Sequence, residues 1–423
     1  MTKEERVAKL VEIEASEPLM NKFIWYKDVN KEFGVHQIPL ELLTYNPYNG
    51  RIMSMTKSFE KQRGAIDLTD ETHRELIEKF LWDSAPDYNQ NTLKSLKRYG
   101  QNEIGIVTKD GVIIDGNRRA FLLGELNKED DLNRKFLGII LPDELHQNRE
   151  EISTLETIYQ IGVDDKVDYN PIEKYLKCDE LREFYSIEQI ASLMSESVPK
   201  INTYLTILSL MKEYLNYLGY PEVYTKLYKK EGHFVDLNNY LNSYSKSATK
   251  YQLVDWPYSD QDILDLKKIY FDYIRLGLPV SNTRAIGRPN KMNSFFCHNE
   301  VWSGFKAKHQ ETLSSYKELT LDEFKVINKG SDLEKLTIER DDLWGEKVGH
   351  KILNNLNYYN RILEDKKNSD SPTELLTRAK GTISLIETKN LNESNKAELS
   401  VLISDIKLQL SEIESHILLF LKD

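Results

Sequence analysis

The sequence predicts an α+β protein, with a small mixed α/β domain followed by a large all-α region that contains a helix-turn-helix. Two patterns support this fold class. Short apolar runs alternate with helix-like segments between residues 91 and 140, which is typical of a small mixed sheet domain. Beyond Pro142 the strand signals fade, and apolar residues recur at helical spacing up to the C-terminus. We expect four domains, at residues 1–145, 146–220, 221–330 and 331–423.

The first 51 residues predict a charged helix, an aromatic segment at Phe23–Tyr26, and then a short strand and a turn that end at Arg51. Residues 52–90 predict one amphipathic helix, from about Asp70 to Trp82, because its apolar residues share one face. The remaining elements of this domain are expected to be a helix at 93–99, strands at 104–107 and 112–114, a helix at 120–126 and a strand at 136–140.

The all-α region predicts helices at 150–160, 171–183, 186–194 and 198–216, then mostly helical sequence over 220–330, and long amphipathic helices at 333–365 and 373–388. In the last helix, seven apolar residues recur at alternating spacings of four and three, which makes an a/d seam over three heptads. They are Leu399, Ile403, Ile406, Leu410, Ile413, Ile417 and Phe420. This seam fits either one helix of an intramolecular bundle or a dimeric coiled coil, and the second alternative predicts a homodimer.

The composition limits the location and the partners. The 423 residues carry a net charge of −11, which argues against a protein that coats nucleic acid over its whole surface but not against a local basic face. Cys178 and Cys297 are isolated and the eight histidines are scattered, so we expect no disulfide framework, no metal site and a reducing, cytoplasmic location. The chain has neither a run of about eighteen apolar residues nor an apolar signal core near Met1, so we expect no membrane span and no export.

Residues 112–120 carry the clearest chemistry. An apolar run ends at Gly116, Arg118 and Arg119 follow, and helix-like sequence comes next. A strand that ends at a glycine and starts a helix there directs backbone N–H groups and the positive helix end toward one point. The two arginines add cationic groups that suit phosphate oxygens. These nine residues alone predict either a phosphate-binding turn or a strand–turn–helix whose arginines pair with surface carboxylates.

A second candidate contact lies in the turn that ends at Arg51. Arg51 follows the Asn46-Pro47 turn, and polar turn residues next to an arginine predict a segment that closes over a ligand. Asn46 is equally suited to an Asx-turn that only shapes the backbone.

The blocks around these two sites resemble the ParB/sulfiredoxin superfamily and occur in that family's order. Residues 38–51 resemble its opening, and residues 93–107 resemble its next helix, glycine and strand. Asp115-Gly116-Asn117-Arg118-Arg119 resembles its Gly-x-Arg-Arg phosphate motif. Asn170–Glu173 and Ser186–Leu208 resemble the helical, DNA-binding part of ParB proteins. The resemblance covers residues 36–215, roughly half of the chain.

This resemblance implies a nucleoside triphosphate, CTP or ATP, with or without Mg²⁺, whose phosphates contact Gly116, Asn117, Arg118 and Arg119. It adds Glu156 as a ligand contact, because Glu156 is the one residue of the ParB motif Glu-Asn-x-x-Arg that is kept in residues 156–160. Asn117 stands where sulfiredoxins carry their reactive cysteine, so sulfinic-acid repair lacks its nucleophile. The incomplete motif leaves nucleotide hydrolysis and the choice of base open.

Residues 186–208 predict the helix-turn-helix. Ser186 and Gln189 fit a capping box that starts a first helix, and residues 195–197 form the turn before a recognition helix at 198–208. The N-terminal side chains of a recognition helix enter the major groove, which selects Ser197, Lys200, Asn202 and Thr203 as DNA contacts. The charge opposes this assignment, since residues 172–217 hold five Lys/Arg against seven Asp/Glu. The alternative is a trihelical packing unit.

A basic segment at 275–309 is the last candidate. It combines six Lys/Arg with one glutamate and with interleaved asparagines and aromatics. Arg284, Arg288 and Lys291, next to glycine and proline, suit contacts to a nucleic-acid backbone. The alternative is a solvated basic loop that pairs with acidic helices.

Together these features favour a nucleotide-dependent DNA-binding protein that acts as a cytoplasmic homodimer. A ParB-like nuclease or phosphotransferase of a mobile-element or anti-phage system is an alternative, with CTP or ATP hydrolysis as a further possible activity. A degenerate module that binds another protein is the third.

Overall fold

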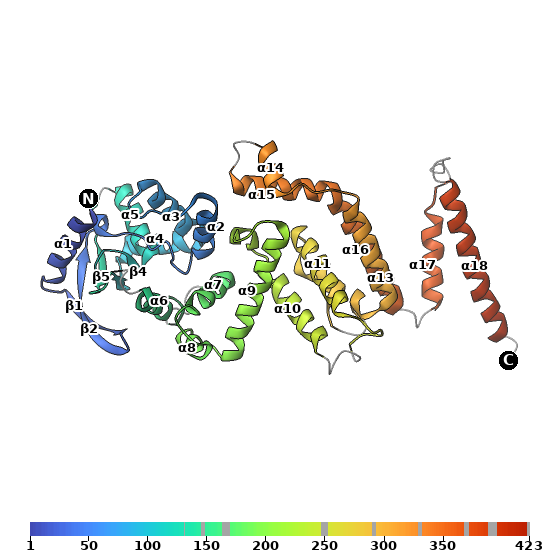
Figure 1. The fold of residues 1–423 in the computed structure, drawn as a ribbon, viewed down its shortest axis with the longest axis horizontal. Coiled ribbons are helices and arrows are strands. Elements are labelled where there is room, and N and C mark those ends of the chain that lie inside the picture. Colours follow the sequence, from blue (N-terminus) through green and yellow to red (C-terminus); the bar gives the residue numbers. More distant parts are fainter. Residues whose placement is uncertain are drawn as a thin grey trace. The chain divides into compact units, whose positions relative to one another are not determined.

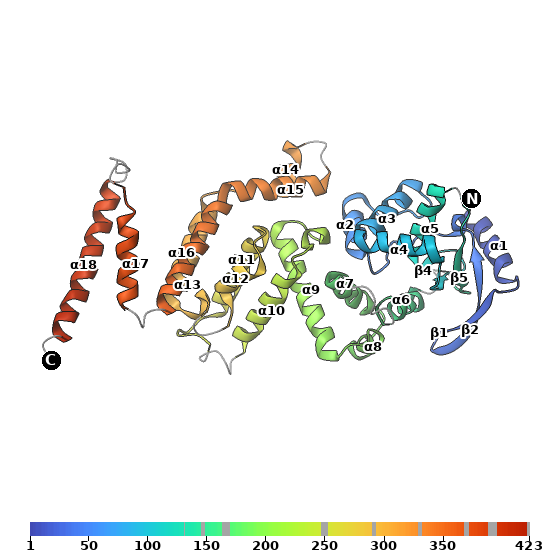
Figure 2. The same ribbon diagram turned by 180° about the vertical axis from the view of Figure 1, so that it is seen from behind.

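The computed structural model describes residues 1–130, 132–144, 149–162, 170–246, 253–289, 293–328, 332–367, 372–387 and 396–420. The chain divides into two compact units, Met1–Asn355 and Leu356–Asp423. The first unit begins with a five-stranded sheet and its helices and continues with helices alone, and the second unit is helical (Figures 1 and 2). The predicted order, a mixed domain followed by a large helical region, is therefore confirmed.

The sheet has the strand order β1-β2-β5-β3-β4. Its strands are β1 (Met20–Tyr26), β2 (Val29–Ile38), β3 (Gly105–Val107), β4 (Ile113–Asp115) and β5 (Phe136–Ile140). All neighbouring strands are antiparallel except β3 and β5, which are parallel. Ile139 in the central strand faces Val35 on one side and Ile106 on the other. The edge strand β4 ends directly before the predicted phosphate-binding turn.

The charged helix expected before residue 36 is present as α1 (Lys3–Glu14), whereas the aromatic segment Phe23–Tyr26 belongs to the strand β1 of a β1–β2 hairpin. The two strands are joined by Lys27 and Asp28, which have φ values of 49° and 60°. Two-residue hairpin loops with two positive φ values usually contain asparagine and glycine, so Lys27-Asp28 gives no recognisable turn signal. Exposed Phe23 and Trp25 alternate with buried Ile24 and Tyr26, a half-buried strand pattern.

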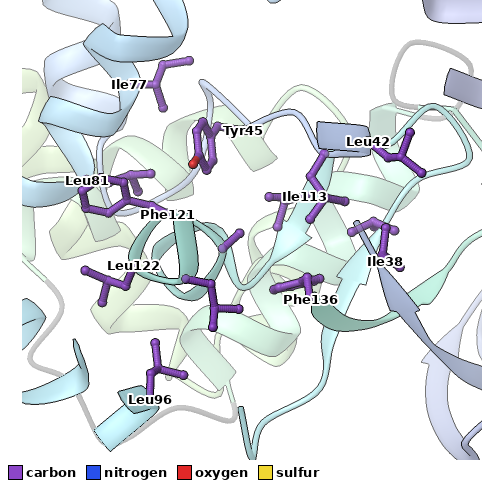
Figure 3. Packing of buried hydrophobic residues seen from close by; sticks show 14 of the residues in the cluster. Ile38, Leu42, Tyr45, Ile77, Leu81, Leu96, Ile113, Phe121, Leu122 and Phe136 are labelled. Atoms are coloured by element: carbon purple, nitrogen blue, oxygen red, sulfur yellow. The ribbon is translucent and has the colours of Figure 1, made fainter. Parts of the chain in front are cut away.

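Helices cover both faces of the sheet. On one face, α5 (Asn117–Asp130) packs its buried Leu122 into a cluster with Ile38 and Phe136, which Figure 3 shows. The same cluster receives side chains from α1 (Lys3–Glu14), the 3₁₀ turn η1 (Leu40–Leu42), α3 (Glu71–Asp83) and α4 (Pro86–Tyr99). On the other face, α6 (Arg149–Thr157) packs Ile152 and Leu155 against Val35 and Ile139.

The single helix expected in residues 52–90 is one of three. α3 matches the expected Asp70–Trp82 helix within a residue, but α2 (Met53–Arg63) precedes it and α4 begins at Pro86. The buried residues of α2 are Met53, Ser54, Thr56 and Ser58. Because three of these four are small and polar, α2 shows no apolar periodicity in the sequence.

The helical part of the first unit starts with the π turn η2 (Ile158–Gly162) and α7 (Pro171–Leu181), α8 (Ile187–Leu193) and α9 (Val198–Leu218). It continues with η3 (Tyr224–Leu227), α10 (Glu231–Ser245), α11 (Asp260–Arg275), α12 (Val280–Gly287), η4 (Phe295–Cys297), α13 (Asn299–Ser314), α14 (Leu321–Ile327), α15 (Leu333–Trp344) and η5 (Gly345–Gly349). α16 (His350–Lys367) spans the division between the units. No helix in the described ranges is long and apolar enough to cross a membrane.

The second unit contains the helices α17 (Pro372–Ser384) and α18 (Lys396–Phe420). The heptad seam predicted in the last helix lies on α18. Its members Ile403, Ile406, Leu410, Ile413 and Ile417 are 41–52% exposed. The described part of the chain therefore does not bury this seam as an intramolecular bundle would.

Candidate phosphate-binding site

The start of α5 has the strand–glycine–helix geometry that the sequence predicts. β4 ends at Asp115, Gly116 adopts a φ of 102°, and α5 begins at Asn117. A Cβ atom on Gly116 would lie 2.7 Å from Cζ of Phe136, so the close approach of this turn to the sheet requires glycine. The N–H groups of the first turn of α5 have no acceptor within the helix, and the positive end of the helix dipole lies there.

Asn117 fixes the neighbouring loop to this turn. Its Oδ1 accepts a hydrogen bond from the Asn46 N–H at 2.9 Å, and its Nδ2 donates to the Ile113 carbonyl at 2.9 Å. Asn46 in turn accepts the Tyr48 N–H through Oδ1, which is an Asx-turn. The side chains of Asn46 and Asn117 thus build the scaffold of the site.

Arg118 and Arg119 have different surroundings. The Arg118 side chain is 9% exposed, donates from Nη2 to Ser84 Oγ at 3.0 Å, and stacks its guanidinium over the Tyr88 ring at 5.1 Å. Arg119 donates from Nη2 to Asp115 Oδ2 at 2.6 Å, which neutralises much of its charge. Arg118 is therefore the stronger candidate for a direct contact to an anion.

A cavity of about 240 Å³ opens at the start of α5, and we call it the first cavity. Residues 115–119 form one wall, and Arg51 and Asn49 of the preceding loop form another. Its remaining lining consists of Tyr88, Thr92, Ser95, Leu96, Gly100, Asn102, Glu103 and Gln160. The structure thus brings Arg51, Gly116, Asn117, Arg118 and Arg119 together, as expected if they bind one ligand.

Glu156 does not reach the wall of this cavity. It is 3% exposed, its Oε1 accepts the Gly50 N–H at 2.9 Å, and its Oε2 binds Lys177 Nζ at 2.9 Å. Burial raises the pKa of the Glu156 carboxyl, and the Lys177 ammonium opposes that shift. Because Lys177 and Gly50 engage both carboxylate oxygens, Glu156 holds the Arg51 loop in place instead of contacting a ligand.

Gln160, one helical turn after Glu156, lines the first cavity, which Glu156 does not reach. Its Nε2 donates to the Ile114 carbonyl at 2.8 Å, and its Oε1 receives no hydrogen bond within the described part of the chain. A buried acceptor without a donor is unfavourable in a folded protein unless a ligand or water supplies one. Sequence reasoning missed Gln160, Ser84 and Tyr88, although Gln160 closes the 156–160 segment in which a ligand contact was expected.

The residues expected to contact DNA lie on the start of α9. Ser186 and Gln189 form the expected capping box on α8, and Ser195 in the turn has a φ of 54°. Ser197, Lys200, Asn202 and Thr203 are all exposed. Lys200 Nζ lies 3.1 Å from Glu196 Oε2, so the only cation of this set already has a partner.

In the basic segment, pairing with acidic residues predominates. Arg275 is buried in ion pairs with Glu318 and Asp341, and Arg284 pairs with Asp236 at 3.0 Å. The interleaved aromatics Phe295, Phe296 and Trp302 are fully buried in the helical core. Arg288 is exposed, whereas Lys291 lies outside the described residues.

Comparison of the chain with protein-family models and with curated proteins finds no match. Within the described ranges, no three His, Cys, Asp or Glu side chains gather in a way that would hold a metal ion.

Proposed function

We propose that the protein binds a nucleotide in the first cavity, with the phosphates at the start of α5. The observation that carries this proposal is the convergence of the α5 N-terminus with Arg118 and Arg51 on one cavity. Helix N-termini and arginine guanidinium groups both bind phosphate oxygens well. The nucleotide is a nucleoside triphosphate, CTP or ATP, with or without Mg²⁺.

Polar groups in the wall support a nucleotide over inorganic phosphate. The buried Gln160 Oε1 offers an acceptor for a hydroxyl or amino group, and Tyr88 offers an aromatic surface under Arg118. The resemblance of residues 36–215 to the ParB/sulfiredoxin superfamily points to the same ligand class. Asp115 and Glu103 make the cavity less cationic than its three arginines alone suggest.

Titration calorimetry with CTP, ATP, GTP and ADP in Mg²⁺ tests this proposal. We expect saturable binding of one nucleotide, and a loss of at least roughly tenfold in affinity for Arg118→Ala. Arg119→Ala should lose less, because Asp115 already pairs with Arg119. Arg134→Ala is the matched control, since Arg134 forms a similar i,i+4 ion pair with Asp130 outside the cavity. If the folded wild type binds none of these nucleotides, the proposal is wrong.

We further propose that α8 and α9 form a helix-turn-helix that contacts DNA, so that the protein is a nucleotide-dependent DNA-binding protein. The capped α8, the left-handed Ser195 and the exposed polar residues at the start of α9 favour this second function. The Arg51 loop is also tied to the helical region through Glu156 and Lys177. A ligand that changes this loop would therefore bias the helices that hold α8 and α9.

Duplex DNA binding measured with and without nucleotide, over a range of salt concentrations, tests the second function. We expect Asn202→Ala and Lys200→Ala to weaken binding, whereas Lys212→Ala, farther along α9, should behave as the wild type. Equal effects of the three substitutions would reject α9 as a recognition helix.

We propose that the protein functions in the cytoplasm, in line with its two buried cysteines, Cys178 and Cys297, which form no disulfide in the described part of the chain. We also propose that the protein acts as a homodimer through the exposed seam of α18.

A further inference from the structure

A second cavity, of about 360 Å³, adjoins the first. Arg51 and Arg118 line both cavities, so the two arginines stand at the junction between them. The rest of the second wall comes from three places: Ser84 and Ala85 before α4, residues 170–172 at the start of α7, and the segment from Tyr228 to the start of α10. Residues from the sheet domain and from the helical region therefore face the same space.

The two cavities differ in chemistry. The first contains the α5 N-terminus and is mostly polar. The second contains Ala85, Pro171 and Ile172 together with Tyr228, whose side chain is 63% exposed. An apolar wall next to an exposed aromatic ring suits a flat heterocycle, because every base offers a π-face for stacking.

The volumes of the two cavities also indicate that each holds a different part of one ligand. Ligand pockets commonly enclose roughly 300–1,000 Å³, and the first cavity falls below this range at about 240 Å³. The two cavities together lie within it. The first cavity thus accommodates only part of a nucleotide, and the adjoining space accommodates the rest.

We propose that the second cavity is the nucleoside subsite of a ligand whose phosphates occupy the first cavity. This inference rests on the proposed nucleotide binding. Tyr228 stacks on the base, Pro171 and Ile172 form the apolar wall beside it, and Arg51 and Arg118 hold the phosphates at the junction. Lys229, also in this wall, adds a positive charge near the phosphates.

Tyr228 is 63% exposed, and Lys229 Nζ lies over its ring at 5.1 Å from the ring centre, so a stacked base would take the face opposite Lys229. Among the described lining residues of this cavity, Glu231 is the acidic one, and it accepts a hydrogen bond from the Tyr175 hydroxyl at 2.6 Å. Arg118 is held at the junction by Ser84 and Tyr88. A nucleotide bound in this way would contact α5 and the start of α10 at once, and so link the sheet domain to the helices.

Calorimetric titration with a nucleoside triphosphate and with inorganic triphosphate separates the two halves of the site. The wild type should bind the nucleotide roughly fivefold or more tightly than triphosphate, the range of stacking on one aromatic ring. Tyr228→Ala should lower the nucleotide affinity by the same factor and leave the triphosphate affinity unchanged. Tyr228→Phe, which keeps the ring, should bind as the wild type does.

Tyr358→Ala is the matched control, because Tyr358 is 59% exposed on α16 and lies outside both cavities. The inference is overturned if Tyr228→Ala and Tyr358→Ala both bind the nucleotide like the wild type, or if the wild type binds nucleotide and triphosphate equally. In either case a loss of binding in Arg118→Ala would leave the proposed function intact. Absence of binding of both probes to the wild type would reject the proposed function together with this inference.

Discussion

At the scale of single residues, Gly116 determines whether the site forms. Its φ of 102° lies in a region that side chains disfavour, and an added Cβ would meet the Phe136 ring at 2.7 Å. The positive φ and the close approach of the Phe136 ring both require glycine at position 116, so no other residue fits there.

We therefore expect Gly116→Ala to lower the free energy of unfolding by about 1–3 kcal/mol and to weaken nucleotide binding, because the start of α5 must shift. Chemical denaturation and calorimetry measure the two effects. Gly124→Ala is the control within the same helix, since a Cβ there meets nothing within 4 Å. It should be neutral or stabilise by up to about 1 kcal/mol. Equal stability of the two variants would contradict the assigned role of Gly116.

The identity of the site residues was predictable only in part, for a reason visible in the arginine pair. The sequence marks Arg118 and Arg119 alike and both line the cavity, yet Arg119 pairs with Asp115 whereas Arg118 donates to Ser84. Glu156 and Gln160 show the same limit of prediction from sequence. Glu156 pairs with Lys177 away from the cavity, whereas Gln160 lines it. The partner of each side chain depends on tertiary contacts between segments far apart in the sequence, which the local pattern does not reveal.

At the scale of elements, the buried Glu173 joins α7 to the start of α2. Its carboxylate accepts hydrogen bonds from the N–H and the hydroxyl of Ser54. Burial raises the pKa of Glu173 to about 7, although the bonds from Ser54 act in the opposite direction. Near neutral pH, the connection between the two helices thus depends on the protonation of one side chain.

Because the pKa of Glu173 is higher in the folded than in the unfolded chain, protonated Glu173 contributes its full stability below about pH 4.5 and loses it as the pH rises through about 7. We expect the unfolding free energy of the wild type to fall between pH 5 and pH 8, by up to about 3 kcal/mol relative to Glu173→Gln. Urea denaturation over this range measures the difference. Glu183→Gln, exposed after α7, should follow the wild type. Parallel profiles for the wild type and Glu173→Gln would reject this link.

Elements with local signals were predicted well, and those defined by distant partners were not. The capping box of Ser186 and Gln189 lies within four residues and correctly marks the start of α8. The buried Ser54 and Ser58 of α2 are satisfied by Glu173 and by the Thr225 N–H, more than a hundred residues away. A helix whose buried face is polar becomes recognisable only when these partners are known.

At the scale of the whole molecule, the seam of α18 is a row of aliphatic side chains that stays exposed among the described residues. The seam side chains repeat at heptad spacing, which is the pattern by which helices of separate chains pack knobs into holes. Burying such aliphatic side chains stabilises an interface by roughly 1.5–3 kcal/mol each, which is ample for a stable dimer. A C2 pair of identical helices satisfies the pattern without any other partner.

We therefore expect the full-length protein to be a dimer in light scattering, and Ile406→Asp combined with Ile413→Asp to make it monomeric without unfolding the first unit. Leu408→Asp is the matched control: Leu408 is 62% exposed on the same helix but off the seam, so the dimer should persist. A monomeric wild type, or equal dissociation by Leu408→Asp, would show that the seam does not pair two copies. Since the proposed DNA contact lies on α9 of each copy, the monomeric variant should also bind DNA more weakly while its nucleotide affinity stays unchanged.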